Sequence, residues 1–376
     1  MAIIRESPMS TLPSAPVRKP HKAPIRVIYS RDDIAAPLPD RVKEYPEFRY
    51  MGSKNRLLPW IHSVLGTLDF ETAADPFAGS GCVAYLLKAM GKRVVASDFL
   101  NFSTTIAQAT IGNSHHQLDG PALKRILGPA KSAPDFIERT FGGIFYQRDD
   151  LRFLDRVSHN IEKLHFPDQQ ALARAALIRS CLKKQPRGVF TITGSRYDDG
   201  RRDLKLSIEE HFLEQVEKFN RVVFDNGRRH TVKRADVFDL RPRGVDLVYL
   251  DPPYVPRSDD NCYIKRYHFL EGLSCYWRGL DIMHDTKVKK IQKRFTPFSY
   301  RRTAAEAFDR MFRLYRNSTI VLSYSSNGYP DLDVLENLMR RYKKNIVTYE
   351  KPHRYHFGTH KGVERAEVQE YLLVGR

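Results

Sequence analysis

The chain has 376 residues, which is more than one hydrophobic core usually needs, so we expect two structural units. Hydrophobic residues make up 41% of the chain and aromatic residues 11%, which is enough to build a sizeable core. The formal net charge of +18 is unusual for a metabolic enzyme and favours a polyanionic partner, because neutralised phosphates release their counterions.

The composition also argues against several other classes of protein. No two of the four cysteines (Cys82, Cys181, Cys262 and Cys275) stand in a C-x-x-C spacing, so no zinc knuckle and no bound metal are expected. No apolar run is long enough to span a membrane, and the N-terminus lacks the apolar core of a signal peptide. We therefore expect a protein of a reducing cytoplasm, although an acidic membrane surface or a generally basic proteome would also explain the charge.

Residues 1–45 are rich in proline and carry scattered basic side chains. Such a composition cannot bury enough apolar area to offset the loss of chain entropy, so a flexible or loosely wrapped tail is expected. The tail could contact phosphates, but a solvated extension explains it equally well. The prolines concerned are Pro13, Pro16, Pro20, Pro24, Pro37 and Pro39.

From residue 70 onward the pattern predicts alternating strands and helices. A strand at residues 70–77 is followed by a helix at 81–90 and a second strand at 93–98. This alternation is typical of an α/β fold with a doubly wound, mostly parallel sheet, built here from residues 46–118 and 230–376. Further strands are expected at 230–238, 246–250, 318–324, 345–349 and 368–375, with helices around residues 308–315 and at 331–343.

Residues 119–229 interrupt this pattern and are expected to form a separate inserted lobe. Helices are predicted at 151–164, 169–184 and 208–224, and a hairpin is predicted to pair residues 189–193 with 203–206. The lobe is either a DNA-recognition domain or an ordinary solvated basic surface, and its position between two blocks of the sheet favours recognition. The candidate DNA-binding residues are Lys183, Lys184, Arg187, Arg196, Arg201, Arg202 and Lys205.

The strongest chemical signal is the sequence Asp251-Pro252-Pro253-Tyr254, which follows the apolar run 245–250. Two prolines cannot continue a central strand, so the chain must turn out at the carboxyl edge of the sheet, where ligands bind. A carboxylate and a proline carbonyl can accept both N–H bonds of an aromatic amine and direct its lone pair toward an electrophilic methyl donor. Tyr254 offers a face for an extruded base. The alternative is a turn that has no chemical role, with a tyrosine that packs in the core.

A second signal is the glycine-rich turn Asp75-Pro76-Phe77-Ala78-Gly79-Ser80-Gly81, which again leads from a strand into a helix. Glycines allow close approach of a ligand, and free N–H groups at a helix start can bind it. Asp98, with Phe99 beside it, ends the next strand 23 residues after Asp75, where an acid typically receives ribose hydroxyls. A nucleoside cofactor without pyrophosphate fits this pair better than NAD, although a tight turn and a capping Asp would look the same.

A third signal is Tyr50-Met51-Gly52-Ser53-Lys54, which precedes an apolar helix face. A Gly-Ser turn with a lysine at a helix start can bind a carboxylate such as the methionine end of a nucleoside cofactor. Taken alone, the segment would more often be an N-cap with a solvated lysine.

The three motifs in this order, separated by a long insertion, resemble the alpha-group, Dam-like adenine-specific DNA methyltransferases over residues 48–375. The resemblance implies a bacterial or phage modification enzyme that uses S-adenosylmethionine, acts on double-stranded DNA and can have a cognate restriction endonuclease as partner. In that family Asp251 and the following three residues would hold a flipped adenine, and the insertion would recognise the target sequence.

The resemblance also implies where the cofactor binds. Tyr50, Gly52 and Lys54 would lie along it, Phe77, Gly79 and Gly81 would surround it, and Asp98 would bind its ribose. A looser match places Asp236 and Val237 beside its adenine, and the segment 323–325 resembles the strand end beside the pocket.

Two other enzyme classes require motifs that can be looked for in the sequence. A cytosine-C5 methyltransferase needs a Pro-Cys pair and a P-loop ATPase needs G-x-x-x-x-G-K-[ST], and neither occurs in the chain. An RNA amine or cytosine-N4 methyltransferase remains open, as does a DNA-binding protein that kept the fold without catalysis. His268 is read as core packing in a helix beside the pocket rather than as a base, and the basic run 287–302 as a backbone contact or a solvated face.

Overall fold

The computed structural model describes residues 25–30, 37–191, 193, 198–241, 243–256, 262–294, 296–354 and 367–376. Its centre is an eight-stranded sheet with the order β1-β9-β10-β7-β5-β2-β3-β4. Every neighbouring pair is parallel except those of β10, which runs antiparallel to both β7 and β9. The expected α/β fold with a mostly parallel sheet is therefore confirmed. The strands are β1 (Ile25–Ile28), β2 (Thr72–Asp75), β3 (Arg93–Asp98), β4 (Thr231–Arg234), β5 (Leu247–Leu250), β7 (Thr319–Ser325), β9 (Ile346–Arg354) and β10 (Glu367–Gly375).

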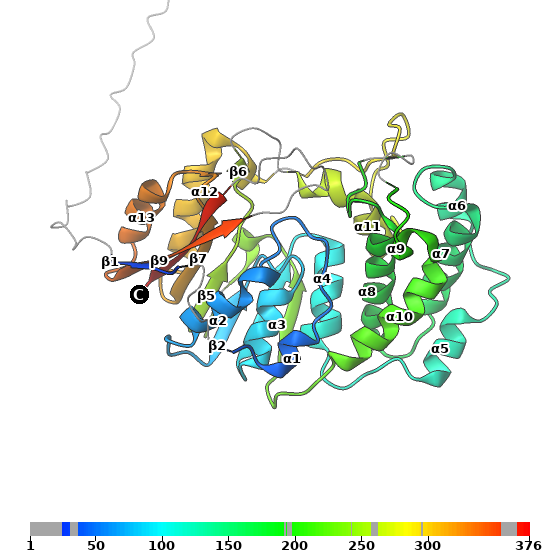
Figure 1. Ribbon diagram of the computed structural model, residues 1–376, viewed down its shortest axis with the longest axis horizontal. Helices are drawn as coiled ribbons and strands as arrows, with labels where there is room; N and C mark the ends of the chain where they lie inside the picture. The colour runs from blue at the N-terminus through cyan, green and yellow to red at the C-terminus, as the bar shows by residue number, and fades with distance from the viewer. Residues whose placement is uncertain are drawn as a thin grey trace, which may run out of the picture.

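Helices cover both faces of the sheet, and alternate residues of each strand reach opposite faces. In β5, Leu247 and Tyr249 belong to one hydrophobic cluster, whereas Val248 and Leu250 belong to another. The first cluster also contains α2, α3 and α4, and the second contains α12 and α13, so the sheet is doubly wound (Figure 1). These helices are α2 (Leu58–Leu65), α3 (Cys82–Ala89), α4 (Asn101–Ala107), α12 (Arg301–Leu314) and α13 (Leu332–Arg340).

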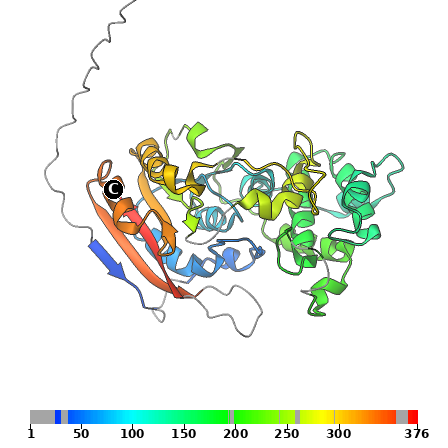
Figure 2. The ribbon, with the colours of Figure 1, turned by 90° about the horizontal axis from the view of Figure 1, so that it is seen from above.

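Residues 120–221 form a helical lobe beside the sheet, which Figures 1 and 2 show at one end of the molecule. Helix α8 is central because it packs against α4, α10 and α11. Its buried side chains belong to the same hydrophobic cluster as β2 and β3, so the lobe and the sheet share one core. The helices are α5 (Gly120–Leu127), α6 (Phe136–Phe141), α7 (Arg148–Ile161), α8 (Pro167–Lys184), α9 (Arg202–Lys205) and α10 (Ile208–Arg221), followed later in the chain by α11 (Tyr263–Cys275).

Shorter elements complete the description. A two-stranded antiparallel ladder pairs β6 (Val255–Pro256) with β8 (Gly328–Tyr329) beside the carboxyl edge of the large sheet. Among the described residues, no helix is both long and apolar enough to cross a membrane. The remaining short elements are the helix α1 (Asp40–Lys43), the 3₁₀ turns at Asn55–Leu57, Val237–Asp239 and Pro297–Ser299, and a π-helical turn at Gln108–Gly112.

The predicted hairpin in the lobe is wrong. Residues 202–205 form helix α9, and the described residues among 189–193 form no strand. The β-branched run around Phe190 serves as an anchor instead: the Phe190 ring is buried and stacks on Phe269 with centroids 5.2 Å apart. The Phe190 N–H donates to the carbonyl of Arg266 at 2.8 Å, so α11 takes the hydrogen bonds that a partner strand would have made.

The expectation of a flexible tail over residues 1–45 is also wrong for the part that the structure describes. Strand β1 pairs in parallel with β9 at the edge of the sheet. Val42 and Tyr45 are buried, and the Tyr45 hydroxyl donates to the Ser80 carbonyl at 2.7 Å. This end of the tail is therefore part of the core that supports the glycine-rich turn. Residues 1–24 and 31–36 lie outside the described residues.

Candidate active site

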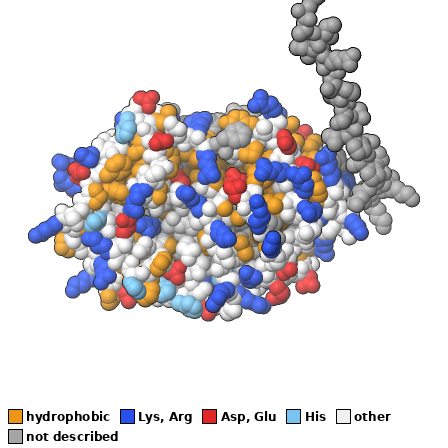
Figure 3. All heavy atoms as spheres, turned by 180° about the vertical axis from the view of Figure 1, so that it is seen from behind, with side chains coloured by type: hydrophobic (Ala, Val, Ile, Leu, Met, Phe, Trp, Pro, Cys, Tyr) orange, Lys and Arg blue, Asp and Glu red, His pale blue; other side chains and the backbone are white. Residues whose placement is uncertain are grey.

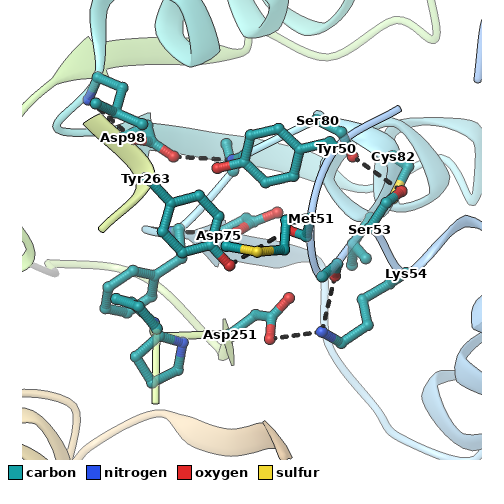
Figure 4. A pocket seen from close by; sticks show the side chains of 18 of the residues that line it. Tyr50, Met51, Ser53, Lys54, Asp75, Ser80, Cys82, Asp98, Asp251 and Tyr263 are labelled. Atoms are coloured by element: carbon teal, nitrogen blue, oxygen red, sulfur yellow. Dashed lines mark hydrogen bonds and ion pairs between the residues drawn. The ribbon is translucent and has the colours of Figure 1, made fainter. Parts of the chain in front are cut away.

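A large cavity, of about 500 Å³, opens at the carboxyl ends of β2, β3 and β5. All three sequence motifs contribute to its wall, together with Asp98 and Phe99 after β3. Figure 4 shows Asp98 and Asp251 on opposite sides of the cavity, with the rings of Tyr50 and Tyr263 between them. The predicted residues that line it are Tyr50, Gly52, Ser53, Lys54, Asp75, Phe77, Gly79, Asp98, Phe99, Asp251, Pro252, Pro253 and Tyr254.

Four predicted residues lie outside this wall. Pro76, Asp236 and Val237 line a smaller pocket of about 20 Å³, which shares Phe77, Phe99 and Pro253 with the large cavity and so adjoins it. Gly81 caps the start of α3 and does not line the cavity. Its φ is +78°, and an added Cβ would lie 2.5 Å from the Tyr45 hydroxyl, so packing against Tyr45 requires glycine there.

Asp98 holds together the turns that follow β2 and β3. Its carboxylate accepts the Gly79 N–H at 2.8 Å and the Leu100 N–H at 2.9 Å. Burial raises the pKa of Asp98 to about 7, although these backbone hydrogen bonds favour the ionised form. Gly79 has a φ of +51°, and an added Cβ would lie 3.1 Å from the Tyr50 ring. The glycine therefore allows the turn to adopt this shape directly under the ring.

Asp75 also lines the cavity and is almost fully buried. Burial, and then the nearby charge of Asp251, raise the pKa of Asp75 to about 8. Its carboxylate accepts the Phe77 N–H at 3.2 Å, which fixes the first residue of the turn after β2. Three carboxyl groups thus meet in one cavity, and two of them hold protons up to near-neutral pH.

Lys54 forms an ion pair with Asp251, whereas the sequence predicts that it binds the carboxylate of a ligand. The Lys54 ammonium donates to the Asp251 carboxylate at 2.8 Å and to the Gly52 carbonyl at 3.0 Å. Burial opposes the charge of Lys54, but attraction to Asp251 outweighs it and holds the pKa of Lys54 above its ordinary value. Burial raises the pKa of Asp251, and Lys54 counteracts part of that rise. The pair therefore stabilises the ionised form of the Asp251 side chain at the cavity wall.

Tyr254 is held against the cavity wall by the end of β7. Its ring meets Tyr324 edge-on with centroids 5.3 Å apart, and the Tyr324 hydroxyl donates to the Pro330 carbonyl at 2.8 Å. At Gly328 in β8, an added Cβ would lie 3.0 Å from the Tyr254 ring, so only glycine fits there. The segment 323–325, singled out in the sequence, therefore lies behind the Asp-Pro-Pro-Tyr turn.

Sequence reasoning missed several residues that α11 and β8 bring to the cavity. Tyr263 and Arg266 of α11 and Asn327 before β8 all line it. The Tyr50 ring stacks on Tyr267 with centroids 5.2 Å apart and planes 6° from parallel, and the Tyr267 hydroxyl accepts the Met51 N–H at 2.7 Å. The sequence did contain one signal for this helix: Tyr263 and Tyr267 are four residues apart and therefore lie on one helix face.

Two buried polar residues of α11 have structural partners. The His268 side chain is inaccessible to solvent and Nε2 lies 2.8 Å from the Phe190 carbonyl, while burial lowers the pKa of His268 to about 4. The expectation that His268 packs in the core is confirmed. The Glu271 carboxylate accepts the backbone N–H groups of Asn101 at 2.9 Å and Phe102 at 3.2 Å. It therefore caps α4, which begins two residues after Phe99 in the cavity wall.

Most of the candidate DNA-binding cations are ion-paired within the lobe. Lys183 pairs with Asp203 at 2.8 Å, and Lys184 pairs with Asp150 at 3.2 Å. Arg201 pairs with Asp199 at 3.5 Å, and Arg202 pairs with Glu214. Arg187, Arg202 and Lys205 are exposed. Arg196 lies outside the described residues. Figure 3 shows Lys and Arg side chains more densely than Asp and Glu on the face opposite to that of Figure 1.

Comparison with known proteins identifies the family. Residues 50–313 match the sequence model of the D12 class N6 adenine-specific DNA methyltransferases. The chain is 30% identical over 329 residues to the type II methyltransferase M2.HphI of Haemophilus parahaemolyticus, which covers 83% of this chain and 93% of the relative. It is 24% identical over 353 residues to the modification methylase LlaI of Lactococcus lactis subsp. lactis, covering 86% of this chain and 54% of that longer relative. The chain belongs to the D12 class N6 adenine-specific DNA methyltransferases.

Proposed function

We propose that this adenine-specific DNA methyltransferase transfers the methyl group of S-adenosylmethionine to the N6 amine of an adenine extruded from duplex DNA. The observation that carries the proposal is the meeting of Asp251 and Asp98 in one cavity at the carboxyl edge of the sheet. Asp251 faces the acceptor side, and Asp98 belongs to the side formed by the glycine-rich turn. Three alternative functions agree less well with the family: methyl transfer to RNA, methyl transfer to cytosine, and DNA binding without catalysis.

The residues present fit the proposed cofactor. A volume of about 500 Å³ accommodates a nucleoside with an amino-acid tail. The Asp98 carboxylate can accept ribose hydroxyls, and the adjoining pocket with Asp236 and Val237 can take the adenine ring. Asp75 offers a carboxyl group to the ammonium of the methionine end, and Ser53 a hydroxyl to its carboxylate. We assign Lys54 to Asp251 instead of to the cofactor, because the two are already paired.

The chemistry assigned to the chain is positioning of the acceptor amine. The sulfonium supplies a strongly electrophilic methyl group when the cofactor is bound. Asp251 and the Pro252 carbonyl accept the two N–H bonds of the amine and aim its lone pair, and Tyr254 stacks on the base. Methylation of N6 would leave the amine with one proton to give up, and Asp251 would be the acceptor of that proton.

We further propose that residues 119–229 form the target-recognition domain. The lobe shares the core of the sheet domain and lies beside the sheet (Figure 1). Duplex DNA that presents a base to the cavity at the carboxyl edge of the sheet would approach along this lobe. Its exposed cations lower the cost of that approach. A cognate restriction endonuclease would be the natural partner of such a modification enzyme in the cell.

Binding and turnover measured on the purified full chain test this proposal. Calorimetry is expected to detect S-adenosylmethionine binding, and tritium transfer is expected on unmodified duplex DNA but not on structured RNA. Asp251→Asn is expected to lower the transfer rate by about 10²–10⁴-fold, whereas Asp285→Asn at an exposed carboxylate is expected to leave the rate unchanged. Absence of cofactor binding by the unaltered chain, or full turnover by Asp251→Asn, would overturn the proposal.

A further inference from the structure

A second cavity, of about 380 Å³, lies in the helical lobe and is open to solvent. It is lined mainly by residues 143–147, which lead into α7, and by residues 184–187, which include the last residue of α8 and the three that follow it. None of its lining residues belongs to the large cavity. We propose that this groove reads base edges in the major groove of the DNA, with Arg187 and Gln147 as the specificity-determining residues. The inference rests on the proposed binding of duplex DNA by the lobe.

The groove adjoins the large cavity through the segment that leaves α8. Gly188 has a φ of +66°, and an added Cβ would lie 2.8 Å from the Cβ of Arg49, the residue before Tyr50 in the cavity wall. Two residues later, the Phe190 N–H donates to the carbonyl of Arg266, which also lines the large cavity. A duplex whose extruded adenine occupies the large cavity would therefore present its neighbouring base pairs to this groove.

The backbone of the groove is fixed by contacts with surrounding elements. Arg49 donates to the Gln185 carbonyl at 3.4 Å, Arg201 donates to the Pro186 carbonyl, and His268 Nε2 lies 2.8 Å from the Phe190 carbonyl. Lys184 is mostly buried in its pair with Asp150, so its role is to join α8 to α7. Base readout needs side chains that project from a rigid frame, and the groove has such a frame.

Two long polar side chains of this groove are accessible to solvent. Arg187 and Gln147 are exposed, and both line the groove. Arginine can bind O6 and N7 of guanine with two parallel donors, and glutamine can bind N6 and N7 of adenine through its amide. A site that only attracted phosphate would need cations alone, whereas the wall of this groove also contains the amide of Gln147 and the exposed carboxylate of Asp198. The residue types therefore favour recognition of bases.

The test maps N6-methyladenine across the DNA of cells that express the full chain or one of its variants. Arg187→Ala is expected to relax the recognised sequence at one guanine position, and Gln147→Ala at one adenine position, each by roughly 5- to 150-fold in discrimination. Arg187→Lys keeps the charge but loses the paired donors, so it is expected to relax the same position. Lys205→Ala, at an exposed cation outside the groove, is expected to slow methylation while the recognised sequence stays the same.

Both side chains are exposed, so the variants are expected to keep the melting temperature and the S-adenosylmethionine affinity of the unaltered chain. An unchanged recognised sequence in Arg187→Ala and Gln147→Ala, with methylation slowed equally at all sites, would overturn the inference. Failure of the proposed function is distinguishable, because the unaltered chain would then deposit no N6-methyladenine at all.

Discussion

Lys54 and Asp251, which are 197 residues apart in the sequence, form an ion pair of 2.8 Å at the wall of the large cavity. The pair joins the turn before α2 to the Asp-Pro-Pro-Tyr turn after β5. Because the Lys54 side chain is 5% exposed and the Asp251 side chain 19%, water weakens their attraction little. The carboxylate that is central to the proposed mechanism is thus oriented by a residue of a different motif, which also stabilises its ionised form.

Lys54→Met is expected to move the acid limb of the pH–rate profile to higher pH. Asp251 accepts the amine only as a carboxylate, so the rate rises as pH passes through the pKa of Asp251. Burial raises that pKa and Lys54 lowers it, so removal of the lysine leaves burial unopposed and raises the pKa further. Single-turnover rates at saturating cofactor across a pH series measure the shift. Lys124→Met, at an exposed position, is the control, and an unshifted limb in Lys54→Met would contradict this role.

The affinity for S-adenosylmethionine is expected to rise with pH through the ionisation of Asp98. Burial raises the pKa of Asp98 to about 7, and only the carboxylate accepts two ribose hydroxyls. One ionisation with that pKa makes binding about tenfold tighter at pH 8 than at pH 6. Calorimetry at both pH values measures this ratio.

Asp98→Asn is the matched variant for that measurement, because an amide does not titrate. Its binding is expected to be weaker and less dependent on pH, and the dependence that remains is assigned to Asp75, whose pKa burial raises to about 8. An equal pH dependence in the two proteins would show that Asp98 is not the group responsible. The raised pKa has a second consequence: the folded chain without cofactor holds the Asp98 proton more tightly than the unfolded chain. The contribution of Asp98 to stability is therefore lost as pH rises from 3.8 to about 7.

Glu271→Gln is expected to weaken cofactor binding with little effect on the rate at saturating cofactor. Glu271 caps α4 through Asn101 and Phe102 and so fixes the turn that carries Asp98 and Phe99. The amide replaces one acceptor with a donor that faces a backbone N–H, which costs about tenfold in affinity if one charged hydrogen bond is lost. Glu306→Gln, on the exposed face of α12, serves as the control. A lower melting temperature with unchanged cofactor affinity would make Glu271 purely structural.

Local sequence patterns were sufficient to predict the strands that carry the site. The strand predicted at residues 93–98 has the same bounds as β3, because an apolar run there ends at a polar residue that must turn out of the sheet. The Asp-Pro-Pro-Tyr turn follows β5 for a similar reason, since two prolines end the ladder. Both features depend on the residue types within a few positions of each other.

Features that depend on distant contacts were not predictable in this way. The run around Phe190 has the composition of a strand, but its hydrogen bonds and packing are supplied by α11, about 75 residues later in the chain. The Pro-rich N-terminal region contains β1 because β9 offers an open edge. Tyr263 and Arg266 reach the cavity because α11 packs against α4 and α8. Each outcome is decided by tertiary packing that overrides local propensity.

The central claim is that Asp251 holds the adenine amine for methyl transfer, and nucleoside mass spectrometry tests it most directly. DNA lacking prior modification is incubated with S-adenosylmethionine and either the unaltered chain or Asp251→Asn, and the digested nucleosides are quantified. The account predicts N6-methyladenine and no N4-methylcytosine from the unaltered chain, and a loss of about 10²–10⁴-fold in the initial rate for Asp251→Asn at equal cofactor affinity. Equal rates of N6-methyladenine formation by the two proteins would contradict it.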